Sequence, residues 1–454
     1  MRAQEVVERT LAAATHLHGC VVLVRESSEA VLRWANSTMT TNGHTTSGRV
    51  TVIAVVAVEG GTAAGVVSSS ASVTDVAQLE ALVRAAESAA RDAGPARDAA
   101  AMVEPSTGDA GWEEPAVETS IGVFGTFAEG LAEVLAGPQR QYGFASHDIT
   151  TTWLGTSTGV RRRWVQPTGS VELNAKTPDL SGSAWTGAST TDFADIDVVA
   201  LAAEAGRRLE WGKRKIELPA GRYETLLPPS AVSDLMIDLM WSMTGRPAQE
   251  GRSAFAGKVG ERLTDLPLTL VSDPVAKGLE TEPFLTTSTS EDGVSVFDNG
   301  MPTRAVEWVR EGVVNELTYS RAEAAEFGTS FTPGGDNLLL TGGSAATGHE
   351  MVASTGRGLL LTCLWYIRVV DPATLLVTGL TRDGVYLVEG GEVVAEVDHN
   401  FRFNYSVLDV LRRASEVGAT ERTLPREWKD WFTRAAMPHV RVPEFNMSSV
   451  SLGR

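Results

Sequence analysis

The sequence predicts an α+β protein, with an N-terminal mixed α/β domain at residues 1–216 and a β-rich C-terminal domain at residues 217–454. The length of 454 residues exceeds that of one ordinary domain, so two or three domains are expected. The stretch "ELPAGRYETLLPPSA" at 217–231 holds three prolines and predicts the boundary. Beyond it helical patterns become rare, and short strand patterns alternate with DG, GG and NG turns.

The first half opens with an amphipathic helix, predicted over residues 4–17 because apolar residues recur near one face. Three short strands are predicted next, at 19–27, 30–43 and 49–61, separated by Ser, Asn and Gly turn signals. Strands joined by short turns pair with their neighbours. The sequence therefore predicts an antiparallel meander.

A second helix is predicted over 72–93, where Ala, Leu, Glu and Arg predominate and Ser72 or Thr74 is available as the cap. Further strands are expected within 148–176. The other helices expected in this half cover 121–135 and 195–215.

Helices are few in the second half, where they are expected at 231–243, 321–326 and 405–415. The first of these carries an apolar stripe with i, i+3, i+4, i+7 spacing. The stripe consists of Val232, Leu235, Met236, Leu239, Met240 and Met243. Such a stripe is typical of a helix that packs against a core or a partner.

Composition and charge exclude several classes of function. The formal net charge of −18 opposes binding to nucleic acid or to an anionic membrane. The one dense basic run, Arg161–Arg163, is typical of a strand end or a loop. Cys20 and Cys363 lie far apart in apolar settings, which predicts neither a disulfide nor a zinc knuckle. Without a signal-peptide pattern or an apolar run of about 20 residues, we expect a cytoplasmic protein.

The usual catalytic motifs are incomplete. His349 and Glu350 match the start of the zinc motif H-E-x-x-H, but Ala353 stands where the second histidine is needed. A loop or a helix cap is the better interpretation of this pair. The sequence also shows no P-loop, no dinucleotide fingerprint and no nucleophile elbow. Composition and spacing alone predict no self-contained active site.

The second half contains distinctive blocks at 218–232, 251–274, 298–328, 336–343, 356–393 and 397–411. These blocks resemble the TldD/PmbA family of modulator-of-gyrase proteins and occur in the order of that family. Weaker similarity is found in the first half, in "AVLRWANSTMTTNG" and "TTWLGTSTGV". The resemblance covers nearly the whole chain and implies the fold of that family.

Members of the TldD type are metallopeptidases whose zinc motif, H-E-x-x-x-H, lies on a helix shortly before a "GKxG" block. Counting back from "FAGKVG" without a gap places Met236 and Trp241 at the two histidine positions and Ile237 at the glutamate position. The third ligand of the TldD type, a cysteine near the C-terminus, has no counterpart in residues 431–454. The resemblance therefore implies a TldE/PmbA-type subunit with no catalytic residue and no bound metal.

For such a subunit, the resemblance implies a heterodimer with a TldD-type partner that holds the zinc and cleaves peptides or unfolded polypeptides. It implies proteolysis or peptide maturation as the function, with no cofactor in this chain. Asp238, Met240 and Trp241 are the candidates for residues that line a substrate passage or face the partner.

Three alternatives remain open at this point. The chain could belong to a related amide-hydrolysing pair in antibiotic biosynthesis. It could act alone as a binding or scaffold homodimer without peptidase activity. It could also be an enzyme that uses other residues, for example Asp238, His349 and Glu350 brought together in space.

Overall fold

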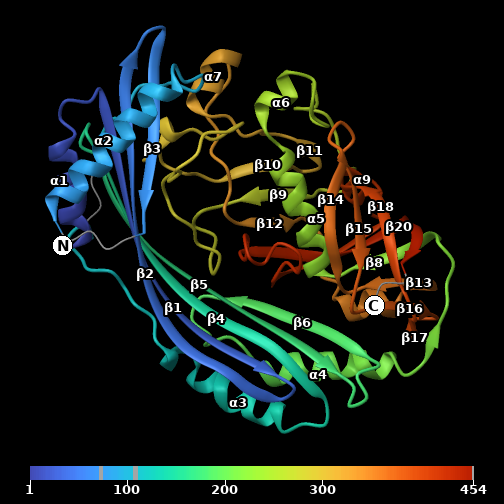
Figure 1. Cartoon of the computed structure of the whole chain (residues 1–454). Helices are drawn as coiled ribbons and strands as arrows, with labels where there is room; N and C mark the ends of the chain where they lie inside the picture. The colour runs from blue at the N-terminus through green and yellow to red at the C-terminus, as the bar shows by residue number, and fades with distance from the viewer. Residues whose placement is uncertain (71–74, 106–110, 452–454) are drawn as a thin grey trace.

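The computed structural model describes residues 1–70, 75–105 and 111–451. Two β-sheets dominate the fold, a six-stranded sheet from the first part of the chain and a fourteen-stranded sheet from the second part. Helices lie against both sheets (Figure 1). The prediction of an α+β protein, mixed at its N-terminal end and β-rich at its C-terminal end, is confirmed.

The first sheet has the order β3-β2-β1-β4-β5-β6 and is antiparallel throughout. Its strands are β1 (Gly19–Ala35), β2 (Thr38–Val58), β3 (Gly61–Ser69), β4 (Arg140–Thr156), β5 (Arg161–Lys176) and β6 (Ser183–Thr190). The predicted meander is confirmed, since β1, β2 and β3 are successive neighbours. The prediction of short strands is wrong, because β1 has 17 residues and β2 has 21.

The long hairpin of β1 and β2 reverses at Asn36 and Ser37. Both residues have positive φ angles, 49° and 57°, as a two-residue type I′ turn requires. The strand predicted at 30–43 therefore contains the turn, and its last residue, Gly43, continues β2 opposite Val31. Asparagine tolerates the left-handed conformation well, so the reversal occurs there.

Four helices cover one face of this sheet (Figure 1). They are α1 (Ala3–Ala13), α2 (Val76–Ala93), α3 (Gly125–Leu135, preceded by the 3₁₀ turn Ile121–Phe124) and α4 (Val198–Trp211). Val22 and Val24 of β1 pack in one core with α1 and α2, while Leu32 and Trp34 pack in another with α3 and α4. All four helices occur where the sequence predicted them.

The N-terminal cap of α2 differs from the prediction. The side chain of Asp75 caps the helix by accepting a hydrogen bond from the backbone N–H of Gln78. In turn, the side-chain oxygen of Gln78 accepts a hydrogen bond from the backbone N–H of Asp75. Ser72 and Thr74, the caps suggested by the sequence, lie outside the described residues.

The opposite face of the first sheet packs against the second half of the chain. Val21, Leu23 and Ile53 point to this side and share a hydrophobic core with Phe284 and Phe297. Successive strand residues point to opposite faces, so the centre of the sheet is apolar on both sides. This explains the unbroken apolar runs in β1 and β2.

The second sheet is built around the 17-residue strand β20, which pairs with β8, β12, β18 and β19. Its strands are β7 (Lys215–Ile216), β8 (Gly221–Leu227), β9 (Thr269–Ser272), β10 (Val306–Arg310), β11 (Val313–Val314), β12 (Leu338–Thr341), β13 (Arg357–Leu361), β14 (Leu364–Asp371), β15 (Leu376–Thr381), β16 (Val385–Glu389), β17 (Glu392–Val397), β18 (Asn400–Ser406), β19 (Glu416–Thr423) and β20 (Ala435–Ser451). Only short helices and one longer helix interrupt this succession of strands.

The helices of this half are α5 (Pro229–Ser242), α6 (Gly245–Gln249), α7 (Arg321–Phe327), α8 (Gly348–Ala353) and α9 (Val407–Arg412). The three predicted helices correspond to α5, α7 and α9, whereas α6 and α8 were not predicted. His349 and Glu350 lie in α8. Glu350 forms a capping box with Thr347, which confirms the helix-cap interpretation of the pair.

The basic run begins β5, as predicted for a strand end. Arg161 forms an ion pair with Glu8 of α1, with 2.6 Å between Nε and Oε1. Arg163 pairs with Glu114 at 3.2 Å. Among the helices of the described residues, none is long and apolar enough to cross a membrane.

Candidate functional site

Helix α5 lies in the core of the C-terminal half. Pro229 occupies its first position, where the missing N–H leaves no bond unmade, and Pro228 provides the extended residue before it. The helix ends where the N–H of Met243 donates to the carbonyl of Met240 at 3.0 Å. The N–H of Thr318 then bonds the Met243 carbonyl at 2.9 Å and fixes this end of the helix.

The three positions aligned with the zinc motif differ in their surroundings. Met236 and Ile237 are fully buried in the hydrophobic core. Trp241 is 42% exposed, and its ring packs edge-to-face on Trp428, with 5.1 Å between ring centroids. A thioether, an alkyl group and an indole lack the imidazole and carboxylate donors that bind zinc in proteins. Zinc does not fit these positions.

The C-terminal end of α5 forms one wall of a pocket of about 720 Å³. Met240 and Trp241, two of the three predicted passage residues, line it. The other walls come from the end of β9, from parts of 281–295 and from 334–337. This volume lies in the range of pockets that hold small ligands or segments of peptides.

A buried hydrogen-bond cluster stiffens the wall near β9. The indole Nε1 of Trp308 donates to Ser272 Oγ at 2.9 Å, and this hydroxyl donates to the carbonyl of Asn337 at 2.5 Å. The side-chain amide of Asn337 donates to the carbonyls of Asp273 and Leu279, at 2.6 and 2.7 Å. Because these groups satisfy one another, the wall has a fixed shape.

A relay of polar side chains joins the first sheet to the pocket. Arg25 of β1 donates from Nη2 to Thr286 Oγ1 at 2.7 Å, and Thr286 donates to Glu282 Oε2 at 2.5 Å. The Glu282 Oε1 atom is buried without a hydrogen-bond partner. Burial raises the pKa of Glu282 to about 7, although the hydrogen bond from Thr286 and the positive charge of Arg25 both act to lower this pKa. Glu282 is therefore able to exchange a proton near neutral pH.

A second carboxylate, Asp336, lines the same pocket. Asp336 keeps an exposed surface, but the loss of water around its carboxylate raises its pKa. The positive charges of Arg434 and Arg25 oppose this rise. Arg434 also hydrogen-bonds Thr168 of β5, so this part of the site rests on the first sheet as well. The pocket thus presents Glu282 and Asp336 with arginines nearby, and Glu291 and Asp292 also line it.

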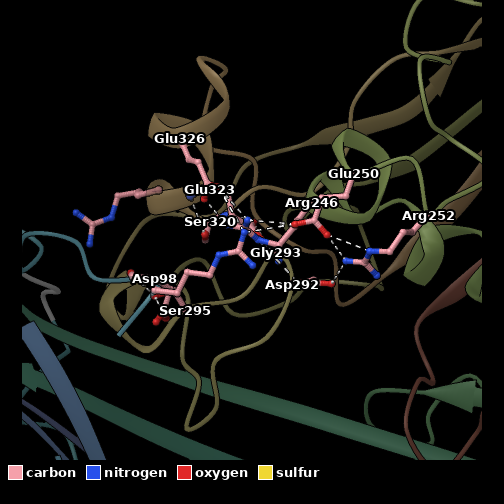
Figure 2. Close-up of polar contacts among 12 residues, drawn as sticks. Asp98, Arg246, Glu250, Arg252, Asp292, Gly293, Ser295, Ser320, Glu323 and Glu326 are labelled. Carbon is pink, nitrogen blue, oxygen red and sulfur yellow. Dashed lines mark hydrogen bonds and ion pairs between the residues drawn. The ribbon is translucent and has the colours of Figure 1, made fainter. Parts of the chain in front are cut away.

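An ion-pair network around Arg246 holds the segment on the far wall (Figure 2). The Arg246 side chain is 6% exposed and donates from Nε to Glu323 Oε1 at 3.0 Å, and from Nη2 to Glu326 Oε2 at 2.6 Å. The N–H of Gly293 donates to both Glu323 oxygens, at 3.2 and 3.0 Å. Since Gly293 lines the pocket, the network fixes the position of this wall.

The N-terminal half contributes a further connection to that wall. Ser295 Oγ donates to Asp98 Oδ2 at 2.6 Å (Figure 2). Arg97 forms ion pairs with Glu250 and Glu326, with closest atoms 3.3 and 3.5 Å apart. Residues from both halves of the chain therefore position the pocket.

Asp238, the third predicted passage residue, does not line this pocket. It is 8% exposed and lies near the fully buried Asp234 and near Glu427. The N–H of Glu427 donates to Asp234 Oδ1 at 2.9 Å. Burial, together with the charge of Glu427, raises the pKa of Asp238 to about 7. The structure thus brings Met240 and Trp241 together at the pocket and leaves Asp238 outside it.

The remaining candidate residues are dispersed. His349 lines a different cleft at the opposite end of α5, and Glu350 is used in the cap of α8. Cys20 and Cys363 are buried, and burial raises the pKa of both thiols to about 12, which disfavours a thiolate ligand. Within residues 1–70, 75–105 and 111–451, no group of three His, Cys, Asp or Glu side chains is arranged to hold a metal ion.

The fold and the pocket define a two-sheet protein whose central buried helix ends at a cavity with both apolar and polar walls. Two domain families match the chain, the "PmbA/TldA metallopeptidase C-terminal domain" over residues 220–449 and the "PmbA/TldA metallopeptidase central domain" over residues 69–213. The chain belongs to the TldD/PmbA family, and the resemblance found in the sequence is confirmed. No curated protein matches it.

Solved structures share this fold over almost the whole chain. TldE from Thermococcus kodakarensis has a TM-score of 0.77 at 15% identity and covers 98% of this chain and 99% of its own. A candidate modulator of a DNA gyrase from Thermotoga maritima has a TM-score of 0.76 at 16% identity, with 98% and 99% covered. A similar candidate from Bacteroides thetaiotaomicron has a TM-score of 0.77 at 15% identity, with 98% of each chain covered.

The polar residues in and beside the pocket were not predicted from the sequence. Arg25, Glu282 and Asp336 are separated by long stretches of sequence, and only Asp336 lies in one of the family-like blocks, at 336–343. Their signal is contact between distant segments, which a single sequence does not display. Arg246 and Glu323 were missed for the same reason.

Proposed function

We propose that this chain is the non-catalytic, TldE/PmbA-type subunit of a two-chain metallopeptidase. A TldD-type partner supplies the zinc and cleaves peptides or unfolded polypeptides in the cytoplasm. The proposal rests on the residues that α5 presents at the zinc-motif positions. Met236 and Ile237 are core residues, and the indole of Trp241 is not a zinc ligand. The chain keeps the fold of a metallopeptidase family without the chemistry of the metal site.

In this proposal the pocket at the end of α5 holds part of the substrate. Trp241 and Met240 supply an apolar side, while Glu282 and Asp336 supply a polar side. The fixed wall at Ser272 and the network at Arg246 keep the cavity open before substrate arrives. A preformed cavity reduces the entropy lost on binding.

The zinc of the partner would polarise the scissile carbonyl and activate water. The residues of this chain bind and orient the peptide. Glu282, with its raised pKa, is able to accept or release a proton at the pocket wall. We place no catalytic residue in this chain.

The separation of Asp238 from His349 opposes an enzyme built on Asp238, His349 and Glu350. His349 lines the cleft at the first turn of α5, which also contains Ser230. Asp238 lies eight residues further along α5, about 12 Å at the rise of an α-helix. Glu350 is held by Thr347.

The proposal is tested by producing the chain alone and together with a TldD-type protein from the same genome. We expect the isolated chain to hold no stoichiometric zinc and to cleave nothing. The purified pair should contain about one zinc per heterodimer and should hydrolyse unstructured peptides. Zinc is measured by mass spectrometry and cleavage with a quenched fluorescent peptide.

Other outcomes of this experiment select the alternatives. Zinc and peptidase activity in the isolated chain would overturn the proposal. A pair that hydrolyses small amides but not peptides would indicate a role in antibiotic biosynthesis. A homodimer that ignores the TldD-type protein would indicate a binding or scaffold protein.

A further inference from the structure

A second cleft, of about 810 Å³, lies at the N-terminal end of α5. Residues of α4 and β6 from the first half form one side, and residues of α8 and β19 from the second half form the other. Pro229 and Ser230 of α5 complete it. The 14 residues of α5 span about 21 Å, so this cleft and the pocket described above lie at opposite ends of one helix.

Apolar groups make up much of the cleft. Trp185 and Leu360 are almost fully buried at its base, and Trp211, Pro229 and Val352 form its sides. Trp211 is held by an edge-to-face contact with Tyr386, with 5.1 Å between ring centroids. These surfaces suit a hydrocarbon or aromatic group.

Arg208 places a positive charge at the base. Its side chain is 15% exposed, its Nη1 donates to the carbonyl of Trp185 at 2.7 Å, and its Nε donates to Glu204 at 2.8 Å. Glu204 also pairs with Arg207, so one carboxylate serves two guanidinium groups. The local charge of this trio is therefore +1.

His439 and the helix end lie on the opposite side of the base. The ring of His439 packs against α8, since a Cβ on Gly348 would lie 2.2 Å from its Nε2. Burial and the charge of Arg208 lower the pKa of His439 to about 4, so the ring is neutral at pH 7. No side chain caps α5, and the amides of Ser230 and Ala231 precede its first internal bond, from Val232.

Other charged groups are found at the rim. Glu392 and Glu421 are exposed, and Arg422 is paired with Asp195. His439 Nδ1 lies 3.6 Å from Glu421 Oε1. Exposed charges are screened by salt over roughly 10 Å, whereas a charge at the base acts in a low-dielectric environment. Arg208, whose side chain is 15% exposed, is therefore screened less than Arg207, which is 61% exposed, and it is the positive group that a ligand meets at the base.

We propose that this cleft is a second binding site, which takes a carboxylate attached to an apolar group. The carboxylate lies against Arg208, His439 and the first turn of α5, and the apolar group lies against Trp185 and Trp211. The C-terminal residue of a peptide has this chemistry, and so does a free aryl or alkyl carboxylic acid. The site is separate from the pocket at the other end of α5 and does not depend on a partner subunit.

The test is calorimetric titration of the isolated chain with three probes. They are the tetrapeptide Ala-Ala-Ala-Phe with a free carboxylate, the same peptide as its C-terminal amide, and N-acetyl-phenylalanine. We expect the acid peptide to bind at least about tenfold more tightly than the amide, because charge-assisted bonds to the carboxylate are lost in the amide. Binding of N-acetyl-phenylalanine with equal affinity would identify a free acid as sufficient; weaker binding would identify a peptide terminus as the ligand.

Two variants locate the binding. Arg208→Gln keeps hydrogen-bond donors but removes the charge, and Val352→Trp fills the side of the cleft. We expect each to weaken binding of the acid peptide at least about tenfold, whereas Arg91→Gln, at a 57% exposed position on α2 outside both cavities, leaves it unchanged. Thermal unfolding confirms that each variant is folded, and Val352→Trp decides the matter if Arg208→Gln does not fold. Equal affinity for acid and amide, no binding at 10 mM probe, or binding that survives Val352→Trp would overturn the proposal.

Discussion

Arg246 and Glu323 form an ion pair whose side chains are 6% and 3% exposed, with 3.0 Å between Nε and Oε1. Glu323 also accepts the N–H groups of Gly293 and Ser320. One carboxylate thus joins α6, α7 and the segment that lines the pocket. Charges this deeply buried are stabilised by each other, so neither tolerates the loss of its partner.

The first prediction concerns this pair. Glu323→Gln leaves Arg246 with Glu326 as its main partner, and we expect the free energy of unfolding to fall by about 3 kcal/mol. Urea denaturation measures the change. Arg252→Gln is the matched control, because Arg252 is 57% exposed and should change stability by no more than about 0.5 kcal/mol. A fall as small as the control would show that the pair does not organise the pocket.

The second prediction compares two of the motif positions on α5. Met236→Ala should cost about 2–4 kcal/mol, because it leaves a cavity in a close-packed core. Trp241→Ala should cost less, because this side chain is 42% exposed and contacts Trp428 and Phe432 at its edge. Thermal and urea unfolding of both variants check the order. Equal losses would contradict the assignment of Met236 to the core and Trp241 to the pocket wall.

The third prediction concerns the wall beside β9. Ser272→Ala removes the acceptor of the buried Trp308 indole N–H and the donor to the Asn337 carbonyl. We expect a loss of about 1–3 kcal/mol, since buried polar groups are left unpaired. Ser288→Ala, at an exposed position, serves as the control and should be neutral. Unchanged stability in Ser272→Ala would mean that water replaces the hydroxyl.

The fourth prediction is a pH dependence. The pKa of Glu282 rises from 4.5 to about 7 in the folded protein, so folding favours its protonated form. The stability that the folded protein gains from protonated Glu282 is fully present below about pH 4.5, and it is lost as the pH rises through about 7. Glu282→Gln should therefore gain stability relative to the native protein between pH 5 and pH 8, by an amount on the order of 2 kcal/mol.

Urea unfolding at pH 5 and pH 8 measures this difference between the two proteins. Ser288→Ala serves as the control, because it changes an exposed residue and removes no titratable group. Its stability relative to the native protein should not depend on pH. A difference for Glu282→Gln that is the same at both pH values would contradict the raised pKa.

Much of the fold could be predicted from the sequence where the signals are local. The periodicity and the apolar stripe predict a buried helix at 231–243, and the structure confirms the helix but starts it two residues earlier, at Pro229. The lengths of β1 and β2 could not be predicted, because Gly43 resembles a turn residue while Asn36 and Ser37 make the actual turn. The pairing of β1 with β2 determines that the chain reverses at Asn36 and Ser37 and not at Gly43.

The candidate site could be predicted in part. Met240 and Trp241 were found through their place on the motif helix, and both line the pocket. Asp238, the third candidate on the same helix, does not line the pocket and lies close enough to Glu427 to feel its charge. Glu282, Thr286 and Arg25 meet only because the first sheet packs on the second half of the chain.

That packing has a practical consequence for dissecting the molecule. The far face of the first sheet is the lid over Phe284, Val296 and Phe297, and Arg25 reaches across to Thr286. A fragment beginning near residue 217 would expose these apolar side chains to solvent, and such a surface promotes aggregation. Expression and crystallisation trials should therefore keep the chain whole. Proteolytic trimming of the N-terminal half should yield an insoluble remainder rather than a working core.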